Sequence, residues 1–274
     1  MDYITLNNGL KMPQLGFGVW QVSDEQATPA VKKALEVGYR SIDTAMIYGN
    51  EKGVGRAIKE SNVPREELFI TTKVWNADHG YENTLKAFDA SLERLGLDYI
   101  DLYLIHWPTP KYDQYVDTYK AMEKIYKDGR AKAIGVCNFD IEHLERLLNE
   151  CEVVPVVNQV ERHPYFQQRE LQDFCEKHHI ILEAYSPLMN GKDVLNDSVV
   201  KEIAKAHGKT AAQVILRWHL QTGVITIPKS VTPSRIEENF DVFDFELTAE
   251  DMEKMTALDR NLRIGAVPSE FNKR

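Results

Sequence analysis

The chain has the size and composition of a globular protein with one large domain or two smaller ones. It contains 274 residues, 43% of them hydrophobic, and its 33 Lys and Arg against 42 Asp and Glu give a net charge of −9. This charge argues against nucleic acid or an anionic membrane as the main partner. No apolar run approaches the roughly 18 residues of a membrane span. The N-terminus lacks the basic and apolar regions of a signal peptide.

Cysteine usage and missing motifs exclude several further classes. The 3 cysteines, at positions 137, 151 and 175, have an odd number and a spacing that predict neither a disulfide nor a metal site. This usage fits a reducing cytoplasm best. The Rossmann and Walker glycine patterns are absent, as are the common zinc, serine-hydrolase and dithiol motifs.

The predicted elements alternate regularly along the chain. A hairpin opens it, with apolar residues alternating around Asn8-Gly9, a dipeptide suited to a type I′ turn. Eight strand-like segments follow, at 15–19, 39–43, 68–73, 99–105, 131–136, 154–160, 180–186 and 224–228. Helical periodicity marks segments between them, including 31–38, 54–58 after a cap at Asn50, 85–95 and 144–148. Two closing helices are expected at 233–241 and 248–258.

This order of elements predicts the fold class. Eight strands that alternate with helices indicate an α/β protein with a parallel sheet. Eight such units in this length favour a closed (β/α)8 TIM barrel over an open sheet, with an N-terminal β-hairpin and extra C-terminal helices. No Ser/Gly/Pro-rich linker divides the chain, so we expect a single domain over residues 1–274.

Four polar residues fall where predicted strands end. Asp43, Lys73 and His106 each close an apolar or β-branched segment, and Tyr48 lies just beyond Asp43. In a barrel of parallel strands these ends open on the same face. A carboxylate, a phenol, an ammonium and an imidazole would therefore converge, and this set indicates an acid–base enzyme.

The chemistry of the four residues is that of carbonyl reduction. We expect Lys73 to lower the pKa of the Tyr48 phenol, and Asp43 to balance the buried lysine. A neutral His106 could orient a carbonyl oxygen through a hydrogen bond. Taken singly, each residue also has a structural explanation: a buried ion pair, a rim aromatic or a core histidine. Their shared level at the strand ends weakens that alternative.

A basic segment follows the last strand. Thr232 suits a helix N-cap and Pro233 the first helical position. Free backbone N–H groups at such a helix start attract anions, and Lys229, Ser230 and Arg235 add two cations and a hydroxyl. Barrels commonly bind phosphate after strands seven and eight. The alternative is a plain helix start with solvated charges.

These residues lie within motifs that occur in order along the chain: LGFGVWQ, GYRSIDTAMIYGNE, TKVW, DLYLIHWP, GVCNF, NQVE and IPKSVTPSRIEEN. Over nearly its full length the chain resembles the aldo-keto reductases. It is most similar to the compact bacterial branch that includes 2,5-diketo-gluconate reductases and glyoxal or methylglyoxal reductases. The resemblance implies a catalytic tetrad of Asp43, Tyr48, Lys73 and His106, with Tyr48 as general acid.

The resemblance also implies an NADPH site across the barrel mouth. Asn138 and Gln159 would hold the nicotinamide carboxamide, and Tyr185 would stack on its ring. The rest of the cofactor would contact residues near the pyrophosphate, the 2′-phosphate and the adenine: Ser186, Leu188, Lys229, Ser230, Arg235, Glu238 and Asn239. The substrate pocket would be walled by His106, Trp20, Trp75 and Trp107. For the three tryptophans, ordinary core or rim packing is the alternative.

Two positions depart from the family pattern. Cys137 stands where the family usually has serine, and a thiol is a weaker hydrogen-bond donor. Met189 stands where the family often has glycine, so the loop over the pyrophosphate is expected to differ. The tail is short, so we expect a pocket whose outer side is open to water.

The expected function is NADPH-dependent reduction of aldehydes and ketones to alcohols. The substrates would be small activated aldehydes, α-dicarbonyls or keto-sugars, and the enzyme would be a cytoplasmic monomer with no metal. One alternative is a cofactor-binding structural or regulatory subunit with little turnover. Another is a phosphosugar enzyme on the same barrel, because fold alone does not fix function.

Overall fold

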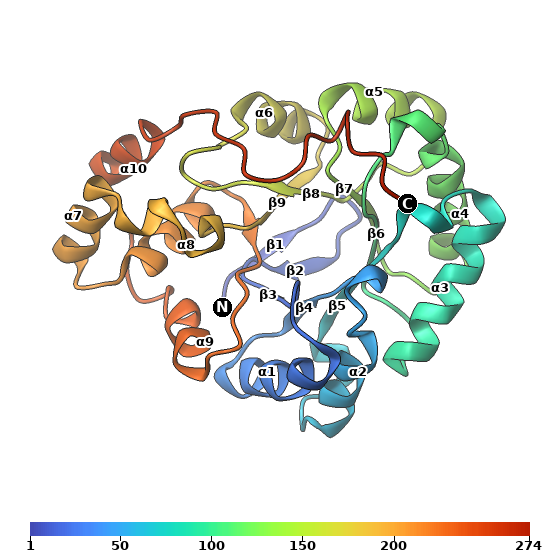
Figure 1. Ribbon diagram of the computed structural model, residues 1–274, viewed down its shortest axis with the longest axis horizontal. Helices are drawn as coiled ribbons and strands as arrows, with labels where there is room; N and C mark the ends of the chain where they lie inside the picture. The colour runs from blue at the N-terminus through green and yellow to red at the C-terminus, as the bar shows by residue number, and fades with distance from the viewer.

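The protein, described by a computed structural model of residues 1–274, is a closed barrel of eight parallel strands inside a ring of helices (Figure 1). The strands are β3 (Phe17–Gly18), β4 (Ser41–Asp43), β5 (Phe69–Val74), β6 (Leu102–Ile105), β7 (Ile134–Cys137), β8 (Val157–Glu161), β9 (Ile181–Tyr185) and β10 (Ile225–Thr226). A parallel bridge between Leu15 and Thr226 closes the sheet, and Gly16 N donates to Thr226 O at 2.9 Å. The predicted barrel is confirmed, and all eight predicted strands overlap the observed ones.

Each strand is followed by a helix that covers the outside of the barrel. This ring is formed by α1 (Asp24–Val37), α2 (Glu51–Glu60), α3 (Tyr81–Leu95), α4 (Tyr115–Lys127), α5 (Ile141–Glu150), α6 (Arg169–Lys177), α8 (Ala211–Gln221) and α9 (Pro233–Phe240). Two additional helices, α7 (Ser198–His207) and α10 (Ala249–Thr256), pack against each other beside α8 (Figure 1). None of the helices has the length and apolar character needed to cross a membrane.

The two expected C-terminal helices have different roles. The helix α9 completes the ring because it packs against both α8 and α1. The helix α10 lies outside the ring and packs on α7. The sequence pattern predicted α10 but not α7. Asn50 precedes α2 as expected, but its side chain does not cap that helix. Instead its amide donates to Val19 O and Val22 O, at 2.9 and 2.8 Å, and so joins two loops at the barrel mouth.

The N-terminal hairpin covers the amino ends of the strands. It consists of β1 (Tyr3–Thr5) and β2 (Lys11–Pro13), and its Leu6 and Met12 are buried against the first residues of the strands. Gly9 N donates to Leu6 O at 2.9 Å, and Gly9 alone in this turn has a positive φ, of 83°. The hairpin is therefore confirmed, but the predicted type I′ turn is wrong: the turn is type I with a following left-handed glycine.

Close helix packing positions α2, which begins just after Tyr48. A Cβ added to Gly55 would lie 2.2 Å from Leu95 O, and one added to Gly53 would lie 2.2 Å from Asp24 O. Both contacts are with backbone atoms, which cannot move as a flexible side chain can. The two glycines therefore let α2 approach the ends of its neighbours.

We predict that Gly55→Ala destabilises the protein by about 1–3 kcal/mol, because the added methyl overpacks a rigid contact. Chemical unfolding of the variant and of the exposed-site control Lys59→Ala, on the same helix, measures this. Alanine has a higher helix propensity than glycine by about 1 kcal/mol. A Gly55→Ala variant more stable than wild type would show that propensity, not packing, governs the position.

Candidate active site

The expected catalytic residues meet at the carboxyl ends of the strands. Asp43 ends β4, Lys73 lies near the end of β5, and His106 directly follows β6. Their side chains meet inside the mouth of the barrel, where Lys73 and Gln159 both contact Asp43 and His106 contacts Tyr48. Tyr48 comes from a short 3-10 turn, Met46–Tyr48, between β4 and α2.

A buried ion pair lies at the centre of this group. Lys73 Nζ donates to Asp43 Oδ1 at 2.6 Å and to Thr44 O at 2.9 Å. Lys73 is 0% exposed and Asp43 2%. Burial alone would lower the pKa of Lys73, but the Asp43 carboxylate and then Tyr48 raise it above its ordinary value. Lys73 is therefore a permanent cation here, held by a carboxylate that it neutralises.

Tyr48 lies over this cation and against His106. Lys73 Nζ is 5.2 Å from the centre of the Tyr48 ring, and the His106 ring meets it edge-on at 5.6 Å. Burial raises the pKa of Tyr48 above its ordinary value, and the opposing effect of Lys73 only partly offsets this. The expected net lowering of this pKa is thus wrong for the ligand-free protein. The hydroxyl stays protonated, as a proton donor must.

His106 is a neutral imidazole. Burial, followed by the nearby Lys73 charge, lowers the pKa of His106 well below its ordinary value. Its backbone oxygen accepts from Asn138 Nδ2 at 3.0 Å, while its Nδ1 is buried without a partner. A neutral imidazole retains one N–H donor. It can therefore orient a carbonyl oxygen without adding charge to the site.

The side-chain amides of Gln159 and Asn138 form hydrogen bonds inside the barrel next to the ion pair. Gln159 Nε2 donates to Asp43 Oδ2 at 2.8 Å and to Glu183 Oε2 at 3.0 Å. Both of its N–H groups are thus committed, which leaves its oxygen as an acceptor for a ligand. That oxygen meets only the weak Cys137 thiol donor, at 3.7 Å. Tyr185 donates its hydroxyl to Asn138 Oδ1 at 2.8 Å.

Cys137 therefore lies where its weaker hydrogen bonding matters. Besides its contact with Gln159, its sulfur accepts from Asn138 Nδ2 at 3.2 Å. Burial raises the pKa of the Cys137 thiol, so it is a neutral packing group and not a nucleophile. The Cys137 sulfur contacts the side-chain amides of both Gln159 and Asn138, at distances longer than the hydrogen bonds of a serine hydroxyl would be.

The loop after β9 has an unusual backbone. Ser186, Met189 and Asn190 all have positive φ values, of 49°, 51° and 56°. The Ser186 hydroxyl donates to Asn190 Oδ1 at 3.1 Å, and Met189 is 3% exposed. The methionine thus packs inward, with Leu188 half-buried beside it.

The basic segment has free cationic groups at the start of α9. Lys229 and Arg235 are exposed and form no ion pair or side-chain hydrogen bond. Thr232 occupies the N-cap position, as expected, but its side chain makes no capping bond, whereas Ser230 Oγ accepts from Thr232 N at 3.1 Å. The remaining two expected contacts lie on the same helix: Glu238 accepts from Thr210 Oγ1 at 2.7 Å, and Asn239 is buried.

The three tryptophans differ in their surroundings. Trp75 packs edge-on against His106, with ring centres 5.3 Å apart, and is almost fully buried. Trp20 is 44% exposed on the loop after β3. Trp107 lies 4.2 Å from the ring of Phe271, in a tilted stack. The structure therefore adds Phe271 to the aromatic group near His106, a residue that the sequence analysis missed.

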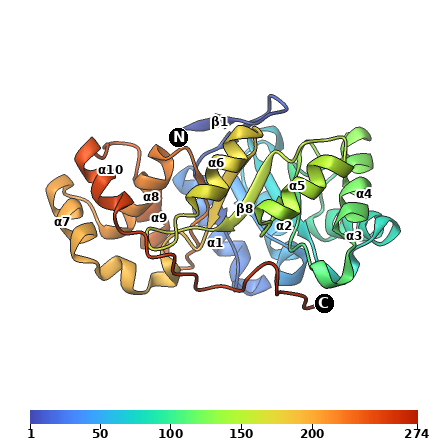
Figure 2. The same cartoon turned by 90° about the horizontal axis from the view of Figure 1, so that it is seen from above.

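Phe271 belongs to a tail that crosses the mouth on the side opposite the hairpin (Figure 2). Glu161, at the end of β8, accepts from Ile264 N and Gly265 N, both at 2.7 Å. Asn76 Nδ2 donates to Lys273 O at 2.7 Å. The expected open outer side is thus wrong beside Trp107, where the short tail covers it. A glutamate at a buried strand end was the available signal for this anchor.

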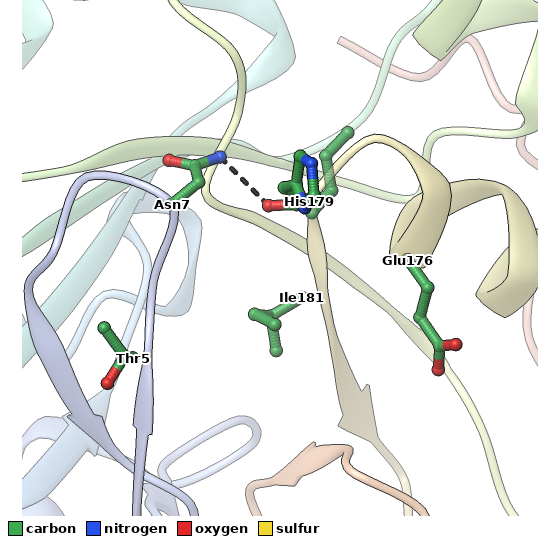
Figure 3. Close-up of a pocket in the computed structure, with 6 residues that line it drawn as sticks. Thr5, Asn7, Glu176, His179 and Ile181 are labelled. Atoms are coloured by element: carbon green, nitrogen blue, oxygen red, sulfur yellow. Dashed lines mark hydrogen bonds between the residues drawn. The ribbon is translucent and has the colours of Figure 1, made fainter.

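A separate recess of about 420 Å³ lies on the hairpin side of the molecule (Figure 3). Thr5, Asn7, Glu176, His179 and Ile181 line it, and Asn7 Nδ2 donates to His179 O at 3.1 Å. It lies beside the start of β9, at the opposite end of the strands from Lys73. It is therefore distinct from the acid–base group.

Comparisons with known proteins show the family of the chain. A profile of the aldo/keto reductase family matches residues 12–260. The chain is 58% identical to glyoxal reductase of Bacillus subtilis (strain 168) over 271 residues, covering 98% of this chain and 97% of that protein. It is 53% identical to methylglyoxal reductase DkgA of Escherichia coli (strain K12) over 269 residues, covering 98% and 97%.

Solved structures agree as well. An aldo/keto reductase of Brucella melitensis has a TM-score of 0.92 at 55% identity, covering 94% of this chain and 99% of that one. A mutant of Gox0644 in complex with NADPH has a TM-score of 0.95 at 48% identity, covering 98% of each chain. The chain belongs to the aldo/keto reductase family. Its predicted membership in the compact bacterial branch is confirmed by the two named reductases.

We predict that Lys73→Met costs about 3–5 kcal/mol of unfolding free energy, because Asp43 would remain as an unpaired buried charge. The double variant Lys73→Met/Asp43→Asn should recover most of that loss, since no charge is left behind. Urea unfolding of the three proteins measures both effects. Wild-type stability in the single variant would contradict the pairing described above.

Proposed function

We propose that the protein reduces small activated aldehydes and α-dicarbonyls, or keto-sugars, with NADPH, and that Tyr48 is the proton donor. The observation that carries this proposal is the buried Lys73–Asp43 pair beneath a protonated Tyr48 and a neutral His106. No simple structural role requires a phenol, a cation and an uncharged imidazole to meet at one end of the barrel.

The proton chemistry follows from the charges. Tyr48 gives its hydroxyl proton to the carbonyl oxygen of the substrate, and Lys73 stabilises the phenolate that remains. Asp43 keeps Lys73 in place and cationic. His106 donates a hydrogen bond to the same carbonyl oxygen and so orients it. Trp75 packs on His106 and excludes water from its face.

The cofactor residues fit a phosphorylated dinucleotide. Lys229 and Arg235 leave two free cations at a helix start, which suits the 2′-phosphate that NADPH carries and NADH lacks. The Gln159 oxygen is the free acceptor for the carboxamide, with Asn138 and Tyr185 beside it. When bound, the nicotinamide supplies the hydride to the carbonyl carbon. The remaining proposed contacts are Ser186, Leu188, Ser230, Glu238 and Asn239.

The shape of the mouth supports small substrates. Trp75, Trp107 and Phe271 form an aromatic wall beside His106, and the anchored tail restricts that side. Trp20, on the loop after β3, is exposed. A small, reactive carbonyl needs no remote binding energy. The names of two relatives, glyoxal reductase and methylglyoxal reductase, agree with this size class.

A structural or regulatory subunit with little turnover is the alternative. Such a role needs the cofactor site, but it does not need the four catalytic side chains to lie together. We further propose a cytoplasmic monomer, in which the three free cysteines stay reduced. Turnover of methylglyoxal with NADPH, measured by loss of cofactor absorbance, separates an enzyme from a binding subunit.

We predict that Tyr48→Phe lowers kcat about 10²–10⁴-fold, because only the transferable proton is removed. NADPH affinity, measured by fluorescence titration, should stay within about twofold of wild type, since the ring remains. Tyr81→Phe, at an exposed position on α3, is the matched control. Wild-type kcat in Tyr48→Phe would refute its role as proton donor.

We predict that Arg235→Ala weakens NADPH binding about ten- to a hundredfold and leaves NADH binding nearly unchanged. A charge-assisted hydrogen bond to phosphate contributes about 1.5–3 kcal/mol, and only NADPH has the extra phosphate. Titrations with both cofactors measure the difference, with the exposed Lys201→Ala as control for net charge. An equal loss for the two cofactors would show that Arg235 does not read the 2′-phosphate.

A further inference from the structure

A second carboxyl group lies inside the barrel, one step below the catalytic residues. Glu183 is the central residue of β9, two positions before Tyr185, so both side chains face inward. Glu183 is 0% exposed. The role proposed for the tetrad makes no use of it, and burying an acid there is costly unless it is paired or protonated.

One amide joins the two carboxyl groups. Gln159 Nε2 donates to Asp43 Oδ2 at 2.8 Å and to Glu183 Oε2 at 3.0 Å. The other oxygen of Asp43 accepts from Lys73, but Glu183 Oε1 has no hydrogen-bond partner. Glu183 is thus coupled to the ion pair on one side and lacks any donor on the other.

The charges around Glu183 do not balance if it is ionised. Three titratable groups act on it from other strands of the barrel: Asp43 on β4, Lys73 on β5 and Cys137 on β7. Lys73 is the single cation among them, and Asp43 already neutralises it. Burial, and then the Asp43 charge, raise the pKa of Glu183 to about 8. Ser41 and Thr71, which face inward on β4 and β5, add buried hydroxyls without partners but no charge.

We propose that Glu183 is a positioning residue that carries a proton at neutral pH, and that loss of this proton at alkaline pH weakens Tyr48 as an acid. The inference rests on the proposed function of Tyr48. In the switching step the O–H bond of the Glu183 carboxyl breaks, its electron pair stays on the carboxylate, and the proton passes to solvent. The new negative charge destabilises the Tyr48 phenolate and competes with it for Lys73.

The presence of a proton on Glu183 can be tested without substrate or cofactor. Native Glu183 holds a proton between its ordinary pKa of 4.5 and the raised value of about 8, whereas the unfolded chain does not. Wild-type stability contributed by this group therefore falls as pH rises through that window. Glu183→Gln mimics the protonated form at every pH. The folding equilibrium constant of wild type relative to Glu183→Gln should fall about tenfold per pH unit there.

Urea unfolding of both proteins across this range measures the slope. Glu123→Gln is the matched control, because Glu123 is also buried but accepts two backbone N–H groups outside the barrel, at 2.7 Å each. If the ratio of the wild-type folding equilibrium constant to that of Glu183→Gln does not change with pH, the proposal is overturned. An equal slope in the Glu123→Gln comparison would also overturn it and would assign the linkage elsewhere.

Infrared difference spectroscopy of the wild-type protein gives a reading that needs no stable variant. A protonated buried carboxyl should give a carbonyl band that disappears as the pH is raised. The absence of any such band in ligand-free protein would contradict a proton on Glu183.

The effect on Tyr48 is read from the pH profile of kcat for methylglyoxal reduction. When kcat is normalised to its value at neutral pH, its decrease at alkaline pH should begin about one pH unit higher in Glu183→Gln than in wild type. Identical normalised profiles would overturn the coupling. A wild type without reductase activity would refute the proposed function instead, while the unfolding slope would still report the Glu183 proton.

Discussion

The buried contact between Lys73 and Asp43 is the interaction on which the site depends. A cation with no exposed surface can persist only where a carboxylate and a carbonyl oxygen accept its protons, and the barrel brings these groups together at 2.6 and 2.9 Å. The parallel pairing of β4 with β5 fixes this geometry in the backbone. The positive charge in turn limits how strongly burial suppresses ionisation of Tyr48, and it adds to the burial that keeps His106 neutral.

The rest of the mouth is organised around that charge by neutral groups. Gln159 commits both of its N–H donors to carboxyl groups, which makes its orientation a consequence of the ion pair. Asn138 and Tyr185 continue this hydrogen-bonded layer. The tail then closes one side through Phe271, held by backbone donors that end on Glu161. Catalytic acidity and access to the mouth are therefore set by different parts of the chain.

The sequence predicted the fold and the meeting of the four acid–base residues because both follow from local patterns. Apolar strands that end in a polar residue place Asp43, Lys73 and His106 on one face of any parallel barrel. The helix α7 was missed, since α7 and α8 follow one another without an intervening strand. Phe271 could not be assigned to the mouth from the sequence, because its position depends on where an irregular tail crosses the strand ends. The raised pKa of Tyr48 needed the three-dimensional burial, which outweighs the neighbouring charge. The roles proposed for the individual cofactor residues remain predictions.

Tyr48 is a protonated phenol whose ionisation depends on its burial and on the Lys73 charge. The most direct measurement is a pH titration by NMR of protein with tyrosines labelled at the ring carbon that bears the hydroxyl, with Tyr48→Phe to assign the signal. Ligand-free Tyr48 should titrate above the ordinary range of a phenol, and still higher in Lys73→Met, because the opposing charge is lost. A phenolate at neutral pH, or a titration that does not respond to Lys73→Met, would contradict this expectation.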